Sequence, residues 1–68
     1  MENNIKELRQ KRKLSQKDLA ESCSVSRQTI NAIENNKYDP TLQLAFQLAS
    51  VLETPLDELF IYENSSKE

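Results

Sequence analysis

Helix-capping residues recur along this chain at short intervals, and they constrain its fold more than any other feature. Five polar residues of the kind that accept hydrogen bonds from free N–H groups each precede a helical stretch: Asn4, Ser15, Ser26, Thr41 and Thr54. Glu7 follows Asn4 by three residues, which resembles a capping box, and Asp18 lies at the third position of the second helix. Pro55 suits the first position of the fifth helix. The sequence therefore predicts an all-α chain of five short helices, the first ending near residue 12 and the fourth near residue 52.

Apolar residues keep helical spacing within each predicted helix, so we expect them to form one core. The stripes comprise Ile5, Leu8, Leu19, Ala20, Ile30, Ile33, Leu42, Ala45, Leu48, Ala49 and Leu52. We expect the core to be completed by Leu14, Val25, Phe46, Leu59 and Phe60. Aromatic and β-branched residues over 60–63 also indicate a short strand, able to pair with the N-terminal residues. We expect a single domain over residues 1–68 with a disordered tail over 64–68.

Chain length and composition exclude several classes of protein. A domain of 68 residues buries only about 60% of its unfolded surface, which leaves little room for an enzyme active site. There is no histidine and no glycine-rich phosphate loop, so we expect no enzymatic activity, no cofactor and no small-molecule effector.

Cys23 is the single cysteine and cannot form an internal disulfide or a cysteine metal site. No apolar run resembles a signal peptide or reaches the roughly 18 residues of a membrane span. We expect a cytoplasmic protein.

Charge is distributed unevenly along the chain, although the total is only −2. Residues 5–37 hold eight basic and four acidic side chains, a net charge of +4, whereas residues 38–68 hold one basic and six acidic side chains, a net charge of −5. Such a bipolar molecule can turn one end toward an anion and keep the other away from it.

The second and third predicted helices have chemistry that suits DNA. Only Cys23, Ser24 and Val25 separate the second helix from the cap of the third, which indicates a helix-turn-helix over about residues 15–35. If Ile30 and Ile33 face the core, the other side of the third helix presents candidate base-reading residues. They are Arg27, Gln28, Asn31 and Ala32. Arginine pairs with guanine, Gln or Asn with adenine, and an alanine methyl with thymine. The alternative is an ordinary solvated face.

Further polar side chains surround this face and could contact phosphates, which position a protein on DNA without reading its sequence. The candidates are Gln16, Lys17, Thr29, Asn35, Asn36 and Lys37. Gln16 and Lys17 also open the second helix, where free N–H groups favour an anion. The basic run at residues 11–13 has two interpretations, because cations at the end of a helix also stabilise its dipole.

The sequence from "LSQKDLAESCSVSRQTINAIENNK" through "YDPTLQLAFQLASVLETPLDELF" resembles the Cro and lambda-repressor-like helix-turn-helix family. The short chain is most similar to small dimeric regulators of the cytolysin-repressor type. The resemblance implies five helices, a bacterial source and binding of double-stranded operator DNA by a homodimer. It also implies base readers at Arg27, Gln28 and Asn31, and phosphate contacts near Gln16, Lys17, Thr29, Asn35 and Lys37. Ser24 and Asn36 depart from the family pattern, which favours glycine at both positions, so we expect some backbone strain at Ser24.

Several residues have both a structural and a functional interpretation. Arg9 lies beside the apolar stripe of the first helix and needs a partner. Glu34 is the candidate, and the resemblance supports this structural ion pair. Cys23 is expected to be a small, partly buried residue, with a redox switch as the alternative. Leu56 could belong to the core or to a dimer interface of the kind found in similar regulators, with Pro55, Leu59 and Ile61 as further candidates.

Two functions remain open at this point. The first is a sequence-specific transcriptional regulator, expected to be a repressor, that binds an inverted-repeat operator as a homodimer. The second is an antitoxin-like module that holds a partner protein and binds DNA secondarily. A toxin gene beside this one would favour the second function.

Overall fold

The structure, a computed structural model, describes residues 1–61 and consists of five helices and one pair of short strands. In chain order the elements are β1 (Glu2–Asn3), α1 (Ile5–Lys11), α2 (Gln16–Ser22), α3 (Arg27–Glu34), α4 (Leu42–Val51), α5 (Leu56–Leu59) and β2 (Phe60–Ile61). The five-helix, mainly α-helical fold predicted from the caps is therefore correct.

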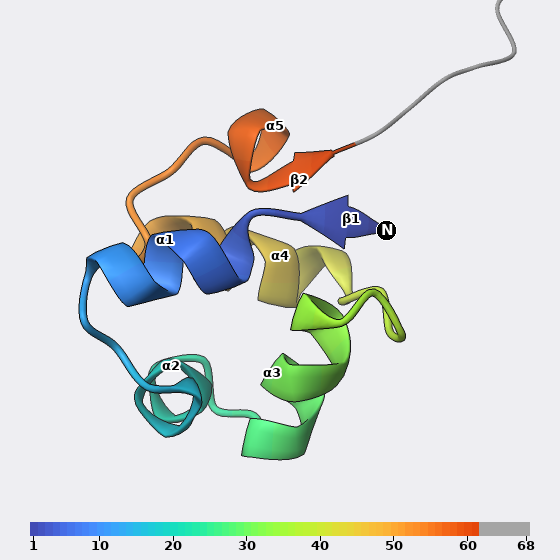
Figure 1. The fold of residues 1–68 in the computed structure, drawn as a ribbon. Helices are drawn as coiled ribbons and strands as arrows, with labels where there is room; N and C mark the ends of the chain where they lie inside the picture. The colour runs from blue at the N-terminus through green and yellow to red at the C-terminus, as the bar shows by residue number, and fades with distance from the viewer. Residues whose placement is uncertain (62–68) are drawn as a thin grey trace, which may run out of the picture.

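The elements are arranged so that α2 and α3 lie on one side of α1 and α4, and α5 lies on the other side (Figure 1). Strands β1 and β2 pair antiparallel, with Glu2 opposite Ile61 and Asn3 opposite Phe60. This is the terminal pairing predicted from the aromatic and β-branched residues. The rest of the predicted strand, residues 62–63, and the predicted disordered tail over 64–68 lie outside the described residues.

Three helices begin at the caps predicted for them. The hydroxyls of Ser15, Ser26 and Thr41 accept hydrogen bonds from backbone N–H groups three residues later, at 2.9, 3.1 and 3.2 Å. At the start of α2 the capping box is complete, because the N–H of Ser15 donates to the Asp18 carboxylate at 3.0 Å. Hydrogen bonds from Ser15 hold the pKa of the Asp18 carboxyl below its ordinary value.

The other two cap predictions were wrong in their hydrogen bonds. Asn4 precedes α1, but its amide donates to the carbonyl of Glu58 on α5 at 3.1 Å, and Asn3 accepts from the first N–H of α1 at 3.1 Å. No capping box forms with Glu7. The Thr54 hydroxyl donates to the Leu52 carbonyl at 2.9 Å, so α5 begins at Leu56 without a side-chain cap. In both cases the side chain donates to a backbone carbonyl outside the helix that it precedes.

The core lies between the five helices and contains the predicted apolar stripes with two exceptions. Its fully buried side chains are Ile5, Leu19, Cys23, Ile30, Ile33, Leu48, Leu52 and Leu59. Leu8, Leu14, Val25, Ala49 and Phe60 are half-buried against it. Leu42 and Phe46, which we predicted to be core residues, are 68% and 56% exposed. Helix α4 has apolar residues on more than one side, and Leu44, Ala45 and Leu48 face the core.

Helices α1 to α4 all end at a left-handed residue, although the chain contains no glycine. Lys13, Ser24, Asn36 and Glu53 have φ values of 59°, 58°, 62° and 50°. At each end the next N–H bonds to a carbonyl five residues earlier, at 2.9 to 3.0 Å, as in a Schellman motif. A left-handed conformation costs a non-glycine residue roughly 1–2 kcal/mol. The strain predicted at Ser24 is therefore present, and it recurs at other helix ends.

Replacing Ser24 by glycine is expected to stabilise the fold. The substitution removes the left-handed strain but makes the unfolded chain more flexible, so the net gain should be about 0.5–1 kcal/mol. In a domain of this size, 1 kcal/mol corresponds to about 4–8 °C in the thermal midpoint, which calorimetry can measure. Ser22→Gly, the same change at a right-handed helical position of α2, is the control and should lower the midpoint. Equal losses in both variants would refute strain at Ser24.

Candidate nucleic-acid interface

Helices α2 and α3 form a tight pair whose connection is fixed by backbone geometry. Residues 23–26 join them, and the left-handed Ser24 reverses the chain. The N–H of Val25 bonds to the carbonyl of Ala20 at 3.0 Å, and the Val25 side chain packs against the core. Figure 1 shows α2 nearly end-on while α3 runs across the view, so the two helices meet at a steep angle. This is the arrangement of a helix-turn-helix.

Helix α3 has a buried side and an exposed side, as its sequence predicts. Ile30 and Ile33 are at most 1% exposed. The side chains of Arg27, Gln28 and Asn31 are exposed, and none of them bonds to another part of the residues that the structure describes. Ala32, the fourth predicted base reader, is half-buried. Arginine and amide side chains are thus free at the N-terminal end of α3.

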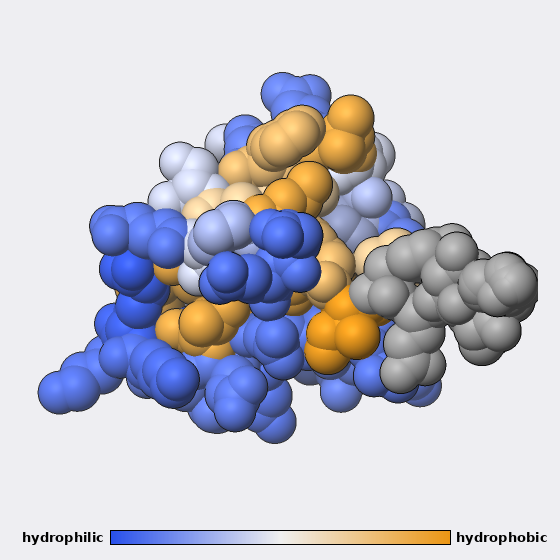
Figure 2. Space-filling view, turned by 90° about the horizontal axis from the view of Figure 1, so that it is seen from above, coloured by the Kyte–Doolittle hydropathy of each residue, from blue (hydrophilic) through white to orange (hydrophobic). Residues whose placement is uncertain are grey.

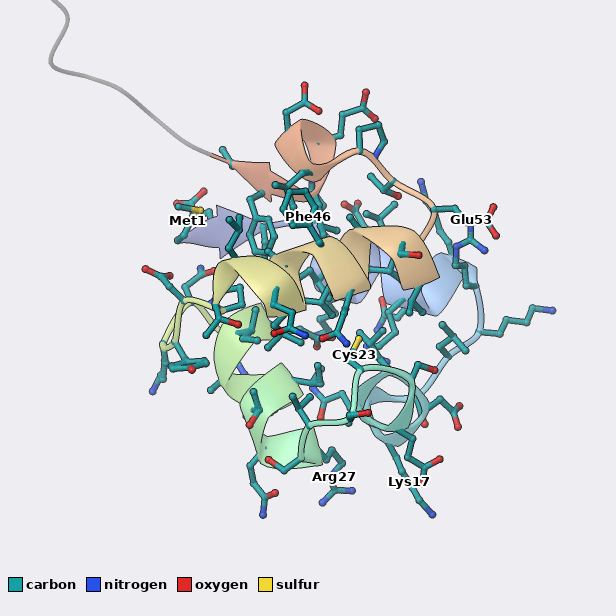
Figure 3. All side chains as sticks on the ribbon, turned by 180° about the vertical axis from the view of Figure 1, so that it is seen from behind. Met1, Lys17, Cys23, Arg27, Phe46 and Glu53 are labelled. Carbon is teal, nitrogen blue, oxygen red and sulfur yellow. The ribbon has the colours of Figure 1, made fainter. Side chains whose placement is uncertain are left out.

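Two lysines accompany these side chains. Lys17 on α2 and Lys37 after α3 are both exposed, and within residues 1–61 neither forms an ion pair with a carboxylate. Figure 3 shows Lys17 and Arg27 extending from the same end of the molecule, away from its body. Two cations from different helices therefore project in a common direction.

The remaining candidates for phosphate contact already have partners in the free protein. The Thr29 hydroxyl lies 2.9 Å from that of Ser26, and the Asn35 amide donates to the Asn31 carbonyl at 2.8 Å. Asn36 is exposed and left-handed, and its side-chain oxygen Oδ1 lies 3.5 Å from the side-chain nitrogen Nδ2 of Asn3. Thr29 is half-buried and Asn35 is exposed.

Comparison with known families identifies this arrangement. The family model described as "Helix-turn-helix" matches residues 5–59, which include all five helices. The chain belongs to the Cro and lambda-repressor-like helix-turn-helix family. In this family the second helix of the motif is the recognition helix, which here is α3.

Relatives of this Cro-like chain occur in archaea and in a bacterium. An uncharacterized HTH-type transcriptional regulator of Methanocaldococcus jannaschii is 48% identical over 64 residues, covering 94% of this chain and 97% of the relative. A regulator of the same description from Archaeoglobus fulgidus is 38% identical, with 93% and 89% coverage. A third, from Bacillus subtilis, is 36% identical, with 97% and 100% coverage. Membership of the family therefore does not indicate a bacterial source.

The Cro-like fold is held together beneath α3 by the ion pair predicted between Arg9 and Glu34. The Arg9 Nε and Nη2 atoms donate to the two carboxylate oxygens of Glu34 at 2.7 and 3.2 Å. The two side chains are 10% and 2% exposed. Arg9 Nη1 donates to the Leu14 carbonyl at 2.8 Å, and Gln16 Nε2 donates to Glu34 at 3.0 Å. The carboxylate at the end of α3 thus connects α1, α2 and α3.

Two other polar features of the Cro-like domain are structural. Within the basic run at residues 11–13, Arg12 Nε donates to the Leu52 carbonyl at 3.1 Å, and Arg12 Nη2 lies 3.3 Å from the Glu53 carboxylate. Arg12 therefore supplies a hydrogen bond and a positive charge at the C-terminal end of α4. The Cys23 thiol is 2% exposed, and burial raises its pKa. Cys23 is therefore more deeply buried than the sequence predicted, and a buried thiol with a raised pKa is protonated and unreactive at neutral pH, which favours a structural role over a redox switch.

The four residues predicted for a dimer interface differ in exposure. Leu59 is 0% exposed and belongs to the core, so it has no surface to offer a partner and that prediction was wrong. Pro55 is exposed, Leu56 is half-buried and Ile61 is 39% exposed. Leu56 lines an open cleft of about 470 Å³ between α4 and α5, together with Met1, Asp39, Pro40, Leu42, Ala45, Asp57 and Phe60.

Sequence patterns missed the main apolar contribution to this surface, which comes from α4. Phe46 follows Leu42 by one helical turn, so their side chains are neighbours. Figure 3 shows Phe46 on the side of α4 nearest the strand pair. Figure 2 looks onto α5 and shows hydrophobic side chains exposed in this region. We call Leu42, Phe46, Leu56, Phe60 and Ile61 the α4–α5 face. The signal that could have found it is the excess of apolar residues on α4.

Across residues 1–61, no helix has the length and the apolar character needed to span a membrane, and no group of three or more acidic or cysteine side chains is placed to hold a metal ion.

Proposed function

We propose that this protein is a sequence-specific transcriptional regulator that represses its target by binding an inverted-repeat operator as a homodimer. One observation carries the proposal. Helix α3 is anchored by Ile30 and Ile33, while its exposed side presents Arg27, Gln28 and Asn31. The relatives named as transcriptional regulators support the regulatory role. An operator-bound dimer would exclude other proteins from the same stretch of DNA.

The exposed side of α3 suits the major groove, which is wide enough for a helix. Arg27 can donate two hydrogen bonds to guanine, and Gln28 or Asn31 can pair with the edge of adenine. Because these residues lie in the first two turns of α3, they would enter the groove first. Half-buried Ala32 would add at most a methyl contact with thymine.

Lys17 and Lys37 would bind the phosphates that border this groove. They are exposed and belong to separate segments on either side of α3. Phosphate contacts release bound counterions, so they contribute affinity that depends on salt but not on base sequence. Thr29, Asn35 and Asn36 would have to exchange their present partners for a phosphate oxygen.

A second copy of the chain would cover the α4–α5 face. Leu42 and Phe46 are more than half exposed, and the cleft beside them is lined mainly by apolar side chains. Apolar surface of this kind marks interaction sites. A twofold dimer would set the two recognition helices about 34 Å apart, which is one turn of DNA. The predicted interface residues Pro55, Leu56 and Ile61 remain part of this proposal.

An antitoxin-like module is the second candidate, because an exposed apolar face can also hold a different protein. The α4–α5 face favours it as much as it favours a homodimer. The mass of the purified protein separates the two functions. A dimer that selects an operator supports the regulator, and a monomer that binds a toxin encoded nearby supports the alternative.

Selection of binding sites from random DNA tests the proposed function directly. The expected product is an inverted repeat whose half-site centres lie about 34 Å apart, that is, about 10 base pairs. A single unrepeated site would refute the homodimer on DNA, and recovery of no preferred sequence would refute specific binding.

Removing Arg27 and removing Lys17 should weaken DNA binding in different ways. Arg27→Ala is expected to relax preference at one position of each half-site by roughly 1–3 kcal/mol. Lys17→Ala should weaken operator and random DNA alike and reduce the salt slope by about one. Fluorescence anisotropy at several salt concentrations measures both effects, and each variant controls for the charge lost in the other. Equal losses on operator and random DNA in both variants would contradict base reading by Arg27.

A further inference from the structure

Gln16, which the resemblance assigns to phosphate contact, is bound to the interior of the protein. Its Nε2 atom donates to the Glu34 carboxylate at 3.0 Å, and its side chain is half-buried. In the part of the chain that the structure describes, this is the one side-chain hydrogen bond between α2 and α3. It joins the first residue of α2 to the last residue of α3.

Glu34, the partner of Gln16, is buried and already bonded to Arg9. The Glu34 side chain is 2% exposed, and both of its oxygens already accept hydrogen bonds from Arg9. A buried carboxylate needs more than a counter-ion, because its remaining lone pairs must also be satisfied. Gln16 supplies a neutral donor for this purpose and leaves the Arg9–Glu34 pair balanced in charge. The bond to Glu34 takes up one of the two N–H donors of this amide, which ties Gln16 to the end of α3.

We propose that Gln16 is a positioning residue, which acts through Glu34 to fix the angle of the recognition helix α3 against α2. This inference rests on the proposed function. The start of α2 and the end of α3 are separated by 17 residues along the chain, and the turn at Ser24 holds them only at their other ends. The hydrogen bond from Gln16 to Glu34 joins the two helices at the ends that the turn does not hold. Arg27 and Gln28 then reach the groove at the same angle in every molecule.

Loss of this link should reduce sequence discrimination more than it reduces general DNA affinity. In Gln16→Met the side chain keeps its approximate size but loses the donor. The ratio of operator affinity to random-DNA affinity should fall about tenfold, the scale on which residues outside a binding site tune it. If Gln16 bound a phosphate instead, both affinities would fall together and the ratio would stay unchanged. That result overturns the inference and leaves the proposed function standing.

A second variant tests the link in the free protein, without DNA. Gln16→Glu places a second carboxylate about 3 Å from Glu34, beside the single cation Arg9, and like charges at this distance cannot both ionise without cost. The variant should lose stability at pH 8 and recover at pH 5, where the new carboxyl can hold a proton and donate it to Glu34. Urea unfolding at the two pH values measures this difference.

Gln10→Glu makes the same change at an exposed position of α1 and should show no such recovery. A pH response equal in the two variants would overturn the link between Gln16 and Glu34. If the unaltered chain selects no operator at all, the proposed function fails and this inference fails with it. Failure of the Gln16 link alone can therefore be distinguished from failure of the proposed function.

Discussion

Replacing Arg9 by alanine should remove about 3–5 kcal/mol from the free energy of unfolding, because it leaves the Glu34 carboxylate buried without its cation. Glu34 is 2% exposed, so water cannot replace the lost partner. A chain of this length typically has only about 3–10 kcal/mol of stability in total. The variant should therefore be close to unfolded at room temperature, and its urea midpoint is the measurement.

Two further variants show whether the charge or the packing is responsible. Arg12→Ala removes an arginine that is 39% exposed, together with its pair to exposed Glu53 and its hydrogen bond to the Leu52 carbonyl, so it should cost about 1–2 kcal/mol, less than Arg9→Ala. The double replacement Arg9→Met with Glu34→Met removes both charges and should recover most of the loss. An unchanged midpoint in Arg9→Ala would contradict a structural ion pair, and a double variant less stable than Arg9→Ala would assign the effect to packing.

Replacing Leu42 and Phe46 together by serine should convert the proposed dimer to a monomer and weaken operator binding by about 100-fold or more. The second half-site is bound from the same complex only while the two copies are joined, and this linkage multiplies affinity by about 10²–10⁴. Because both side chains are more than half exposed, their loss should cost the folded monomer little.

Sedimentation and operator titration of the same samples test this prediction. Gln43→Ser, a change at an exposed position of α4 outside the α4–α5 face, should leave both mass and affinity unchanged. Operator binding that weakens while the protein stays dimeric would place the interface elsewhere. A monomeric variant with unchanged affinity would refute dimeric binding.

Local sequence signals predicted the elements of this fold well. Ser15, Ser26 and Thr41 cap the helices they precede, because their hydrogen bonds reach only three residues ahead. Asn4 and Thr54 also lie at helix starts, but the Asn4 amide donates to the carbonyl of Glu58 on α5, and the Thr54 hydroxyl donates to the carbonyl of Leu52, two residues earlier. Whether Asn4 meets the Glu58 carbonyl depends on tertiary structure, which a capping pattern does not contain.

At the surface, too, the sequence predicted correctly the exposure that a local pattern determines, and it failed where tertiary packing determines the exposure. The two sides of α3 differ strongly in polarity, so helical periodicity alone was enough to predict that Ile30 faces the core and Arg27 faces solvent. Helix α4 has apolar residues on several sides, and periodicity could not tell that Leu44 and Leu48 face inward while Phe46 faces out. Helix α5 has only four residues, too few for a period to decide whether Leu59 belongs to the core or to a dimer interface, and the sequence made it a candidate for both.

The free exposed side of α3 has a consequence for how regulators of this design can diverge. Arg27, Gln28 and Asn31 support no packing, and exposed side chains of this kind usually change stability by within about 0.5 kcal/mol when replaced. If these side chains read bases as proposed, substitutions there can alter operator preference without endangering the fold. A duplicated gene could acquire a new set of target promoters through a few changes on one helix, while the buried residues stay as they are.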